Sequence, residues 1–226
     1  MYRKIVGSLI YLTLMRPDIS NVVGVLSKFV QNPRKPHLDA VRRVLRYVKG
    51  NPSYGVLFER ESKIELTGYY DADYARDLDT RHSTSGYMFM ISNGAVSWCS
   101  RRQPTVSLST PEAEYRATVL AAQECTWLVR LLKELNQEIE NKFVMRGDNI
   151  SSICLAENPT FHARSKRIEV HYHYIRERVL NREVDIKYIN TEEQLDDMLT
   201  KRLLRKKMTK FYEGFGMASA SVEREY

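Results

Sequence analysis

Apolar residues recur at helical spacing through the first 50 residues, and prolines divide this region into three short helices. The pattern predicts helices over residues 2–14 and 18–30, separated at Pro17, and a third over residues 36–49. The third helix carries apolar residues on one face, three or four positions apart: Leu38, Val41, Leu45 and Val48. Gly50 follows as a C-terminal stop. We therefore expect a helical N-terminal segment that is too small to be a complete domain.

From residue 54 onward the pattern changes to that of β-strands. Residues 55–59 and 64–74 are expected to be extended, and residues 85–92 and 95–101 are expected to form a hairpin. The hairpin is predicted from Asn93-Gly94, because a type I′ turn requires positive φ at both central positions. The strands that begin at residues 64, 85 and 95 therefore predict an antiparallel meander.

Helices and strands alternate in the remainder of the chain. The expected helices cover residues 110–135, 151–156, 168–180, 192–201 and 205–215, and the expected strands cover 143–146 and 184–189. A polar loop is expected over 159–167, and a frayed end over the last ten residues. This order indicates an α/β fold with a mixed five-stranded sheet, antiparallel in strands 1–3 and parallel in strands 4–5, flanked by helices.

Two aspartates lie at the ends of predicted strands that can lie next to each other in this sheet. Asp71 is near the end of the first strand of the meander, and Asp148 comes directly after the fourth strand. Binding sites in such sheets form beyond the carboxyl ends of adjacent strands. Glu114 lies near the start of the long helix, where Thr110 is the expected N-cap, and Asp197 lies in a later helix. We hypothesise that these four carboxylates converge.

Four carboxylates brought together without a Lys or Arg would repel each other strongly. The metal-free site should then contain at least one carboxyl group with a raised pKa, and it should bind divalent cations avidly. Two Mg²⁺ ions about 3.5–4 Å apart, with Mn²⁺ as a substitute, can activate a water molecule and stabilise the leaving oxygen of a phosphodiester. The acids therefore predict a metal-dependent hydrolase of the nucleic-acid backbone.

The net charge of the chain is concentrated near its N-terminus. The whole excess of +7 lies in residues 1–62, which contain eleven Lys and Arg against four Asp and Glu. A basic segment favours an anionic partner, with nucleic acid first. The polar face of the third helix carries basic residues that either contact phosphates or only keep the surface soluble: Arg42, Arg43, Arg46 and Lys49.

Length and composition exclude other classes of protein. The 226 residues are enough for one or two domains with a buried core. No apolar run approaches the roughly 20 residues of a membrane span, so no membrane partner is expected. The three widely spaced cysteines argue against a disulfide framework and for a reducing compartment.

Several long motifs resemble one protein family. Four motifs resemble the ribonuclease H domain of copia-type LTR-retrotransposon Pol polyproteins. They are residues 71–75 (Asp-Ala-Asp-Tyr-Ala), 81–87 (Arg-His-Ser-Thr-Ser-Gly-Tyr), 102–115 (Arg-Gln-Pro-Thr-Val-Ser-Leu-Ser-Thr-Pro-Glu-Ala-Glu-Tyr) and 191–201 (Thr-Glu-Glu-Gln-Leu-Asp-Asp-Met-Leu-Thr-Lys). The upstream motifs at 16–19 and 36–47 resemble the tail of the reverse transcriptase of the same polyprotein. The resemblance implies a reverse transcriptase tail over 1–62, a ribonuclease H domain over 63–203, and a C-terminal helix with a frayed tail over 204–226.

The resemblance implies a ribonuclease H-like fold that cleaves the RNA strand of RNA–DNA hybrids during reverse transcription. It carries four catalytic, metal-binding acids over to this chain: Asp71, Glu114, Asp148 and Asp197. Family members have a single acid after Leu195, whereas this chain has Asp196 and Asp197, and Asp197 keeps the register with the Met-Leu-Thr-Lys that follows. Glu169 and Asp196 are the alternatives for the fourth acid.

This chain departs from the family pattern at four positions near the acids. Tyr70 and Tyr74 stand where Thr and Trp are usual, Arg76 replaces Gly, and Gly147 precedes Asp148. None of these departures removes a proposed metal ligand. Arg76 is expected to alter substrate entry or metal affinity.

The resemblance also implies the partners: an RNA–DNA hybrid and the reverse transcriptase portion of the polyprotein. Candidate contacts to the hybrid are basic or polar residues near the acids and in the polar loop, with three hydroxyl groups: Arg101, Arg102, Gln103, Asn149, Arg164, Lys166, Arg167, Ser83, Thr84 and Ser109. The expected location is intracellular, in the cytoplasm, in virus-like particles or in the nucleus.

Two competing interpretations remain at this point. An integrase or transposase would use Glu183, which lies 35 residues after Asp148, but this leaves Glu114 and Asp197 without a function, so we reject it. A non-catalytic hybrid-binding module, or a domesticated remnant, is the second alternative.

Overall fold

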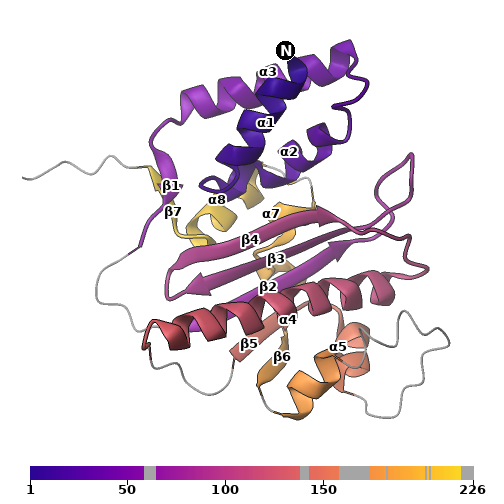
Figure 1. Cartoon of the computed structure of the whole chain (residues 1–226), viewed down its shortest axis with the longest axis vertical. Helices are drawn as coiled ribbons and strands as arrows, with labels where there is room; N and C mark the ends of the chain where they lie inside the picture. The colour runs from indigo at the N-terminus through magenta and orange to yellow at the C-terminus, as the bar shows by residue number, and fades with distance from the viewer. Residues whose placement is uncertain are drawn as a thin grey trace, which may run out of the picture.

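A central β-sheet lies between two layers of helices, and the N-terminal helices lie beyond the β4 edge of that sheet (Figure 1). This computed structural model describes residues 1–58, 65–137, 143–157, 174–181, 183–201, 203 and 205–219. Within those residues, no helix is long and apolar enough to cross a membrane.

The sheet has five strands in the order β4-β3-β2-β5-β6. Its strands are β2 (Leu66–Asp73), β3 (Thr84–Ile91), β4 (Gly94–Arg102), β5 (Phe143–Gly147) and β6 (Val184–Tyr188). The pairs β2–β3 and β3–β4 are antiparallel, whereas β2–β5 and β5–β6 are parallel. The expected mixed five-stranded sheet is therefore confirmed, and the parallel pair β2–β5 brings two carboxyl ends to the same edge.

The hairpin between β3 and β4 is present, but its turn is shifted by one residue from the prediction. Ser92 and Asn93 form the turn, with a φ of 58° at Ser92, and Gly94 already belongs to β4. A Cβ atom on Gly94 would lie 2.5 Å from Cδ1 of Phe58. The glycine is thus required for the close packing of Phe58 rather than for a positive φ.

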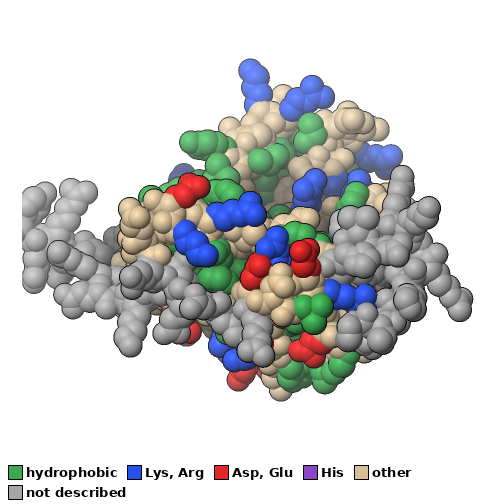
Figure 2. Space-filling model, turned by 60° about the horizontal axis from the view of Figure 1, so that its bottom comes forward, with side chains coloured by type: hydrophobic (Ala, Val, Ile, Leu, Met, Phe, Trp, Pro, Cys, Tyr) green, Lys and Arg blue, Asp and Glu red, His purple; other side chains and the backbone are tan. Residues whose placement is uncertain are grey.

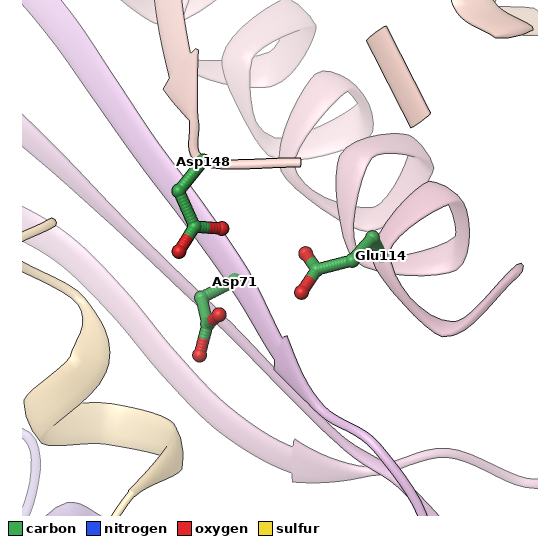
Figure 3. A group of neighbouring side chains, drawn as sticks. All are labelled: Asp71, Glu114 and Asp148. Atoms are coloured by element: carbon green, nitrogen blue, oxygen red, sulfur yellow. The ribbon is translucent and has the colours of Figure 1, made fainter. Parts of the chain in front are cut away.

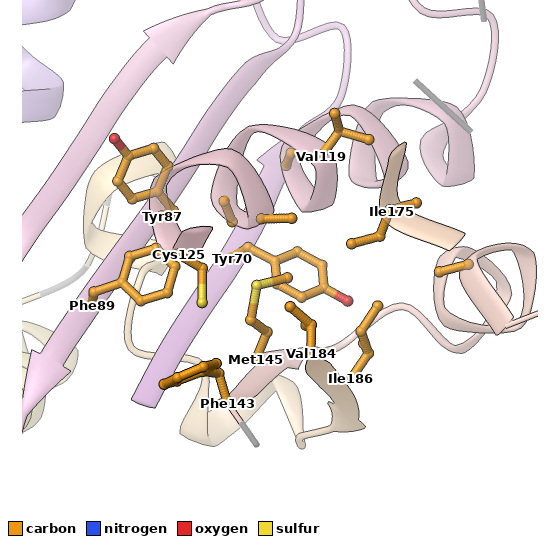
Figure 4. Packing of buried hydrophobic residues seen from close by; sticks show 14 of the residues in the cluster. Tyr70, Tyr87, Phe89, Val119, Cys125, Phe143, Met145, Ile175, Val184 and Ile186 are labelled. Atoms are coloured by element: carbon orange, nitrogen blue, oxygen red, sulfur yellow. The ribbon is translucent and has the colours of Figure 1, made fainter. Parts of the chain in front are cut away.

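The larger hydrophobic core fills the space between the sheet and the long helix α4 (Thr110–Glu134) (Figure 4). Tyr70, Phe89 and Met145 from three strands are buried there, and small α4 residues such as Ala117 let the helix approach closely. Burying one side chain of the size of Phe89 stabilises the fold by about 1.5–3 kcal/mol. Helix α5 (Ile150–Glu157) and the helical residues 174–180 complete this layer.

A second core covers the opposite face of the sheet. Helices α7 (Asp197–Thr200) and α8 (Arg205–Gly214) contribute Leu199 and Phe211 to it, both buried against β2, β3 and β4. The predicted helix over 192–201 is only partly present. A 3₁₀ turn, η2 (Thr191–Glu193), is followed by the extended Gln194 and a turn at residues 195–196, and α7 begins only at Asp197. The break occurs because Gln194 is extended and donates a hydrogen bond from Nε2 to the Tyr70 carbonyl oxygen at 2.7 Å.

The N-terminal segment forms its own hydrophobic cluster and docks on the sheet. It contains α1 (Tyr2–Leu12), the 3₁₀ turn η1 (Pro17–Ile19), α2 (Ser20–Ser27) and α3 (Lys35–Gly50). Trp98 on β4 donates a hydrogen bond from Nε1 to the Thr13 carbonyl oxygen at 2.9 Å. Asn21 on α2 donates from Nδ2 to the Leu199 carbonyl oxygen at 2.8 Å. The segment therefore packs on β4 and α7.

The predicted frayed end is wrong for residues 217–219. The strand β7 (Met217–Ser219) pairs with β1 (Tyr54–Val56) in a separate antiparallel two-stranded sheet. Nearby, the Tyr47 hydroxyl contacts both Asp18 Oδ2 at 2.6 Å and the Tyr212 hydroxyl at 3.0 Å. The C-terminal part of the described chain is thus tied to the N-terminal segment.

A candidate carboxylate metal centre

Three of the four predicted acids meet at the edge of the sheet where β2 and β5 end (Figure 3). Each of Asp71, Glu114 and Asp148 offers a carboxylate oxygen, and these oxygens lie within 4.8 Å of one another. The register explains the first pair: Tyr69 on β2 faces Arg146 on β5, so two residues further on Asp71 comes beside Asp148. Glu114 enters from the start of α4, which packs on β2 and β3.

Glu114 is a buried carboxyl group whose surroundings favour its protonated form. It is 4% exposed, and its Oε2 accepts a hydrogen bond from the Ala72 amide at 3.1 Å. Burial, followed by the charges of Asp71 and Asp148, raises the pKa of Glu114 to about 9. The expected raised pKa in the metal-free site is therefore located at Glu114.

The helix cap is Ser109 rather than Thr110, since Ser109 Oγ accepts from the Glu112 amide at 3.3 Å.

A lysine lies among the acids, contrary to the expectation of an unaccompanied carboxylate cluster. Lys201 Nζ donates to Asp71 Oδ1 at 3.0 Å and to Asp197 Oδ1 at 2.5 Å. Thr200 Oγ1 donates to the other carboxylate oxygen of Asp71. Burial opposes the charged form of Lys201, but the carboxylates of Asp71 and Asp197 outweigh it and raise the pKa of the ammonium group. Lys201 is thus a fixed cation that partly neutralises this site.

Asp197, the predicted fourth acid, is linked to Asp71 through Lys201 and is not among the three carboxylates that converge. Asp197 is buried, and burial raises its pKa while the bond from Lys201 lowers it. Asp196 is fully buried, its two oxygens have no hydrogen-bond partner among the described residues, and burial raises its pKa well above the ordinary value. Glu169 lies outside the described residues. The choice of Asp197 as fourth ligand stays a prediction.

The donor set fits a hard divalent cation. All three convergent groups are carboxylates, which are the oxygen ligands that Mg²⁺ and Mn²⁺ prefer. Asp71 and Glu114 are buried, so their mutual repulsion is only weakly screened by solvent. A bound cation would offset this repulsion, which adds to the burial that raises the pKa of Glu114.

No protein-family model matches the chain, but curated proteins are similar to it over nearly its whole length. The chain is 44% identical over 219 residues to the retrovirus-related Pol polyprotein from transposon TNT 1-94 of Nicotiana tabacum. It is 39% identical over 216 residues to that from transposon RE1 of Arabidopsis thaliana. Both alignments cover 96% of this chain. The chain belongs to the copia-type retrotransposon Pol family.

The similarity concerns a small part of these Pol polyproteins. The chain spans 16% of the tobacco protein and 15% of the Arabidopsis protein. Among solved structures, LC11-RNase H1, isolated from compost by a metagenomic approach, aligns with 61% of this chain and 94% of its own at 13% identity, with a TM-score of 0.46.

Two departures from the Pol family pattern are in contact with each other. A Cβ atom on Gly147 would lie 2.4 Å from Cζ of Tyr70, so the glycine before Asp148 makes room for the large ring. Arg76, the third departure, forms an ion pair with Asp73 at 2.9 Å. Arg76 is therefore paired with Asp73 rather than with the metal-centre residue Asp71.

The predicted nucleic-acid contacts other than Thr84, which is half-buried at the start of β3, fall into four groups. Gln103 and Ser83 are buried: Gln103 Nε2 donates to Ser85 Oγ and to the Ala113 carbonyl oxygen, both at 2.9 Å, and Ser83 Oγ accepts from the Ala75 amide at 3.1 Å. Asn149 and Ser109 accept hydrogen bonds from backbone amides at helix starts. Arg101 and Arg102 are exposed at the end of β4. Arg164, Lys166 and Arg167 lie outside the described residues.

The face of the molecule shown in Figure 2 carries both signs of charge. Lys and Arg side chains gather at the top of this view, over the N-terminal helices, and others lie beside Asp and Glu side chains near the centre. A polyanionic strand approaching this face would meet basic groups as well as acidic ones.

The geometry also excludes the integrase-type arrangement. Glu183 forms an ion pair with Arg178 at 2.5 Å and precedes β6. Because β5 and β6 are parallel, Glu183 lies at the end of the sheet opposite to Asp148. The two acids cannot share one metal ion.

Proposed function

We propose that this chain is a metal-dependent endonuclease that hydrolyses the RNA strand of RNA–DNA hybrids, the ribonuclease H activity of a retrotransposon Pol polyprotein. The observation that carries the proposal is the convergence of Asp71, Glu114 and Asp148 within 4.8 Å at the carboxyl ends of parallel strands. Membership of the Pol family supports it, because reverse transcription leaves an RNA template paired with new DNA. The reverse transcriptase portion of the same polyprotein is the proposed protein partner.

Asp71, Glu114 and Asp148 would hold Mg²⁺, with Asp197 as the proposed fourth ligand. Bound divalent ions would supply an activated water molecule and would stabilise the charge on the leaving oxygen. Thr200 and Lys201 each donate to one oxygen of Asp71 and so fix its orientation. The raised pKa of Glu114 keeps a proton on its carboxyl group in the metal-free protein, and Glu114 would release that proton to hold a cation.

Substrate binding is proposed to be independent of sequence, through backbone phosphates and the 2′-hydroxyl groups that distinguish RNA from DNA. Arg101 and Arg102 are exposed near the metal centre and present donors without acceptors. The loop residues Arg164, Lys166 and Arg167 remain proposed contacts.

The alternative is a hybrid-binding module without catalytic activity. A binding module has no need for two carboxylates that are 0% and 4% exposed and close enough to repel each other. Placing such groups together is destabilising unless a cation or a proton compensates. The arrangement therefore favours catalysis.

The experiment is a cleavage assay on four labelled substrates: an RNA–DNA hybrid, double-stranded RNA, double-stranded DNA and single-stranded RNA, each with Mg²⁺ or Mn²⁺. We expect cleavage of the RNA strand of the hybrid alone. Binding of the hybrid without any cleavage under either metal would replace the proposal with the non-catalytic alternative. In the same assay, an active Asp197→Asn variant would move the fourth ligand to Asp196 or Glu169.

A further inference from the structure

A groove runs between α2 of the N-terminal segment and the strands β3 and β4. It consists of two adjoining stretches of about 390 and 560 Å³ that share lining residues, among them Lys28 beside α2, Thr84 on β3 and Arg102 on β4. Figure 1 shows α2 above β4, so one wall comes from each part of the chain. Thr84 lies beside Asp73 in the sheet register, so the groove is at the end of the sheet that carries Asp71.

The first stretch of the groove is basic. Lys28, Arg101 and Arg102 line it together with uncharged residues, and no acid lines it. Among the described residues, the side chains of Arg101 and Arg102 have no hydrogen-bond or ion-pair partner, and both are exposed. Guanidinium groups are donors only and match phosphate oxygens in geometry.

The second stretch leads to the metal centre. Thr200 lines it and donates a hydrogen bond directly to Asp71. This stretch also contains Asp73, Asp77 and Asp79, of which Asp73 is paired with Arg76, and Asp77 is paired with Lys28 at 2.8 Å. An anionic strand in the basic stretch would therefore continue toward Asp71 past partly neutralised acids.

The wall formed by α2 is fixed in place. Asn21 Nδ2 and Ser100 Oγ both donate to the Leu199 carbonyl oxygen, at 2.8 and 2.5 Å. These bonds join α2, β4 and α7 beside the groove, and Leu199 is fully buried. These hydrogen bonds and the packing around Leu199 therefore fix the spacing between Lys28 and the two arginines.

We propose that this groove binds the phosphodiester backbone of the RNA–DNA hybrid, so that the N-terminal helical segment is part of the substrate-binding surface of the nuclease. This inference rests on the proposed function for the identity of the nucleic acid. Lys28, Arg101 and Arg102 donate to phosphate oxygens, and Lys28 exchanges Asp77 for a phosphate when the strand binds.

Mutations of the Lys28–Asp77 ion pair can distinguish a phosphate-binding role of Lys28 from a purely structural one. The two roles predict different directions of change in affinity for the hybrid. Lys28→Gln and Asp77→Asn both break the ion pair, so a purely structural pair predicts the same direction of change for both. In a phosphate-binding groove the directions are opposite, since the first change removes a donor and the second removes a competing charge. The hydrogen bond from Lys28 lowers the pKa of Asp77 to about 2, so Asp77 is charged at neutral pH.

The measurement is the affinity for a fluorescent RNA–DNA hybrid as a function of salt, by anisotropy, in an Asp71→Asn background that prevents cleavage. Losing one phosphate contact should reduce the slope of log affinity against log salt by about one unit. At 0.1 M salt the loss should be roughly eightfold in affinity. We expect this for Lys28→Gln and for Arg101→Gln, and we expect tighter binding for Asp77→Asn.

The matched control is Lys133→Gln. Lys133 is in the last turn of α4, nineteen residues beyond Glu114 and so roughly 28 Å further along that helix. The Lys133→Gln substitution should leave unchanged both the affinity for the hybrid and its slope against log salt. Circular dichroism checks that each variant is folded, and Arg101→Gln, on the β4 wall, tests the groove independently of the ion pair.

The groove proposal is overturned if Lys28→Gln and Arg101→Gln keep the wild-type slope, or if Lys28→Gln and Asp77→Asn shift affinity in the same direction. This failure is distinct from that of the proposed function. Cleavage of the hybrid by the otherwise unchanged chain, with unchanged salt slopes in the groove variants, would sink the groove alone. Absence of cleavage with altered slopes would leave a nucleic-acid groove on a non-catalytic module.

Discussion

Replacing Glu114 by glutamine should make the metal-free protein more stable while it abolishes the proposed activity. Glu114 is buried beside Asp71 and Asp148, and its pKa is raised from 4.5 to about 9. A carboxyl group with a raised pKa holds a proton in the folded state that the unfolded state has released. Stability therefore falls as pH rises between 4.5 and about 9. Glutamine is neutral in both states and keeps an oxygen to accept the Ala72 amide.

The magnitude follows from the same shift. One pH unit corresponds to about 1.36 kcal/mol, so at pH 7.5 the three units above the unfolded value of 4.5 amount to about 4 kcal/mol. At pH 6 the same reasoning gives about 2 kcal/mol. The gain from Glu114→Gln should thus be positive and should increase with pH.

The assay is urea unfolding in EDTA at pH 6 and pH 7.5, with Glu112→Gln as the control. Glu112 is in the first turn of the same helix, and its Oε1 pairs with Arg116 at 2.7 Å. Its replacement should cost about 0–1 kcal/mol at both pH values. Adding Mg²⁺ should stabilise the wild type and close part of the gap. A Glu114→Gln variant no more stable than the wild type in EDTA, or a gain independent of pH, would refute the reasoning.

Two further predictions concern the surroundings of the metal centre. Lys201→Met removes the cation that is paired with both Asp71 and Asp197. Because the Lys201 side chain is 27% exposed, we expect a loss of about 1–3 kcal/mol of stability in EDTA, with a larger stabilisation by Mg²⁺ than in the wild type. Equal urea midpoints for the two proteins would contradict this. Gly147→Ala should lower the free energy of unfolding by about 1–3 kcal/mol, because the added methyl group overpacks against Tyr70. The loss should be smaller in a Tyr70→Thr background. Additive effects in this double-mutant cycle would show that the two departures are independent.

Much of the site could be predicted because it depends on the order of the elements. Asp71 lies near the end of one strand and Asp148 directly follows another, and parallel neighbours end at the same edge of a sheet, so their proximity follows from the α/β order. Glu114 needed more: the sequence places it near the start of the long helix, and its approach to the two aspartates was a hypothesis that the resemblance supported.

The parts that sequence reasoning missed depend on contacts between distant segments. Lys201 was not placed among the acids, because its position depends on the interruption at Gln194, which is caused by a hydrogen bond to Tyr70 more than a hundred residues away. The strand Met217–Ser219 is three residues long and pairs with Tyr54–Val56, so no local periodicity indicates it. The one available signal for Lys201 was its spacing of four residues from Asp197, which favours an ion pair on a helix.

The central claim is that Asp71, Glu114 and Asp148 form a metal centre that cleaves the RNA strand of a hybrid. The most direct test is the rate of cleavage of a labelled RNA–DNA hybrid in Mg²⁺ by the wild type and by Asp71→Asn, with Asp39→Asn on the exposed surface of α3 as the control. The account predicts that the wild type and Asp39→Asn cleave the RNA strand equally and that Asp71→Asn falls to background. Cleavage by Asp71→Asn at the wild-type rate would contradict it.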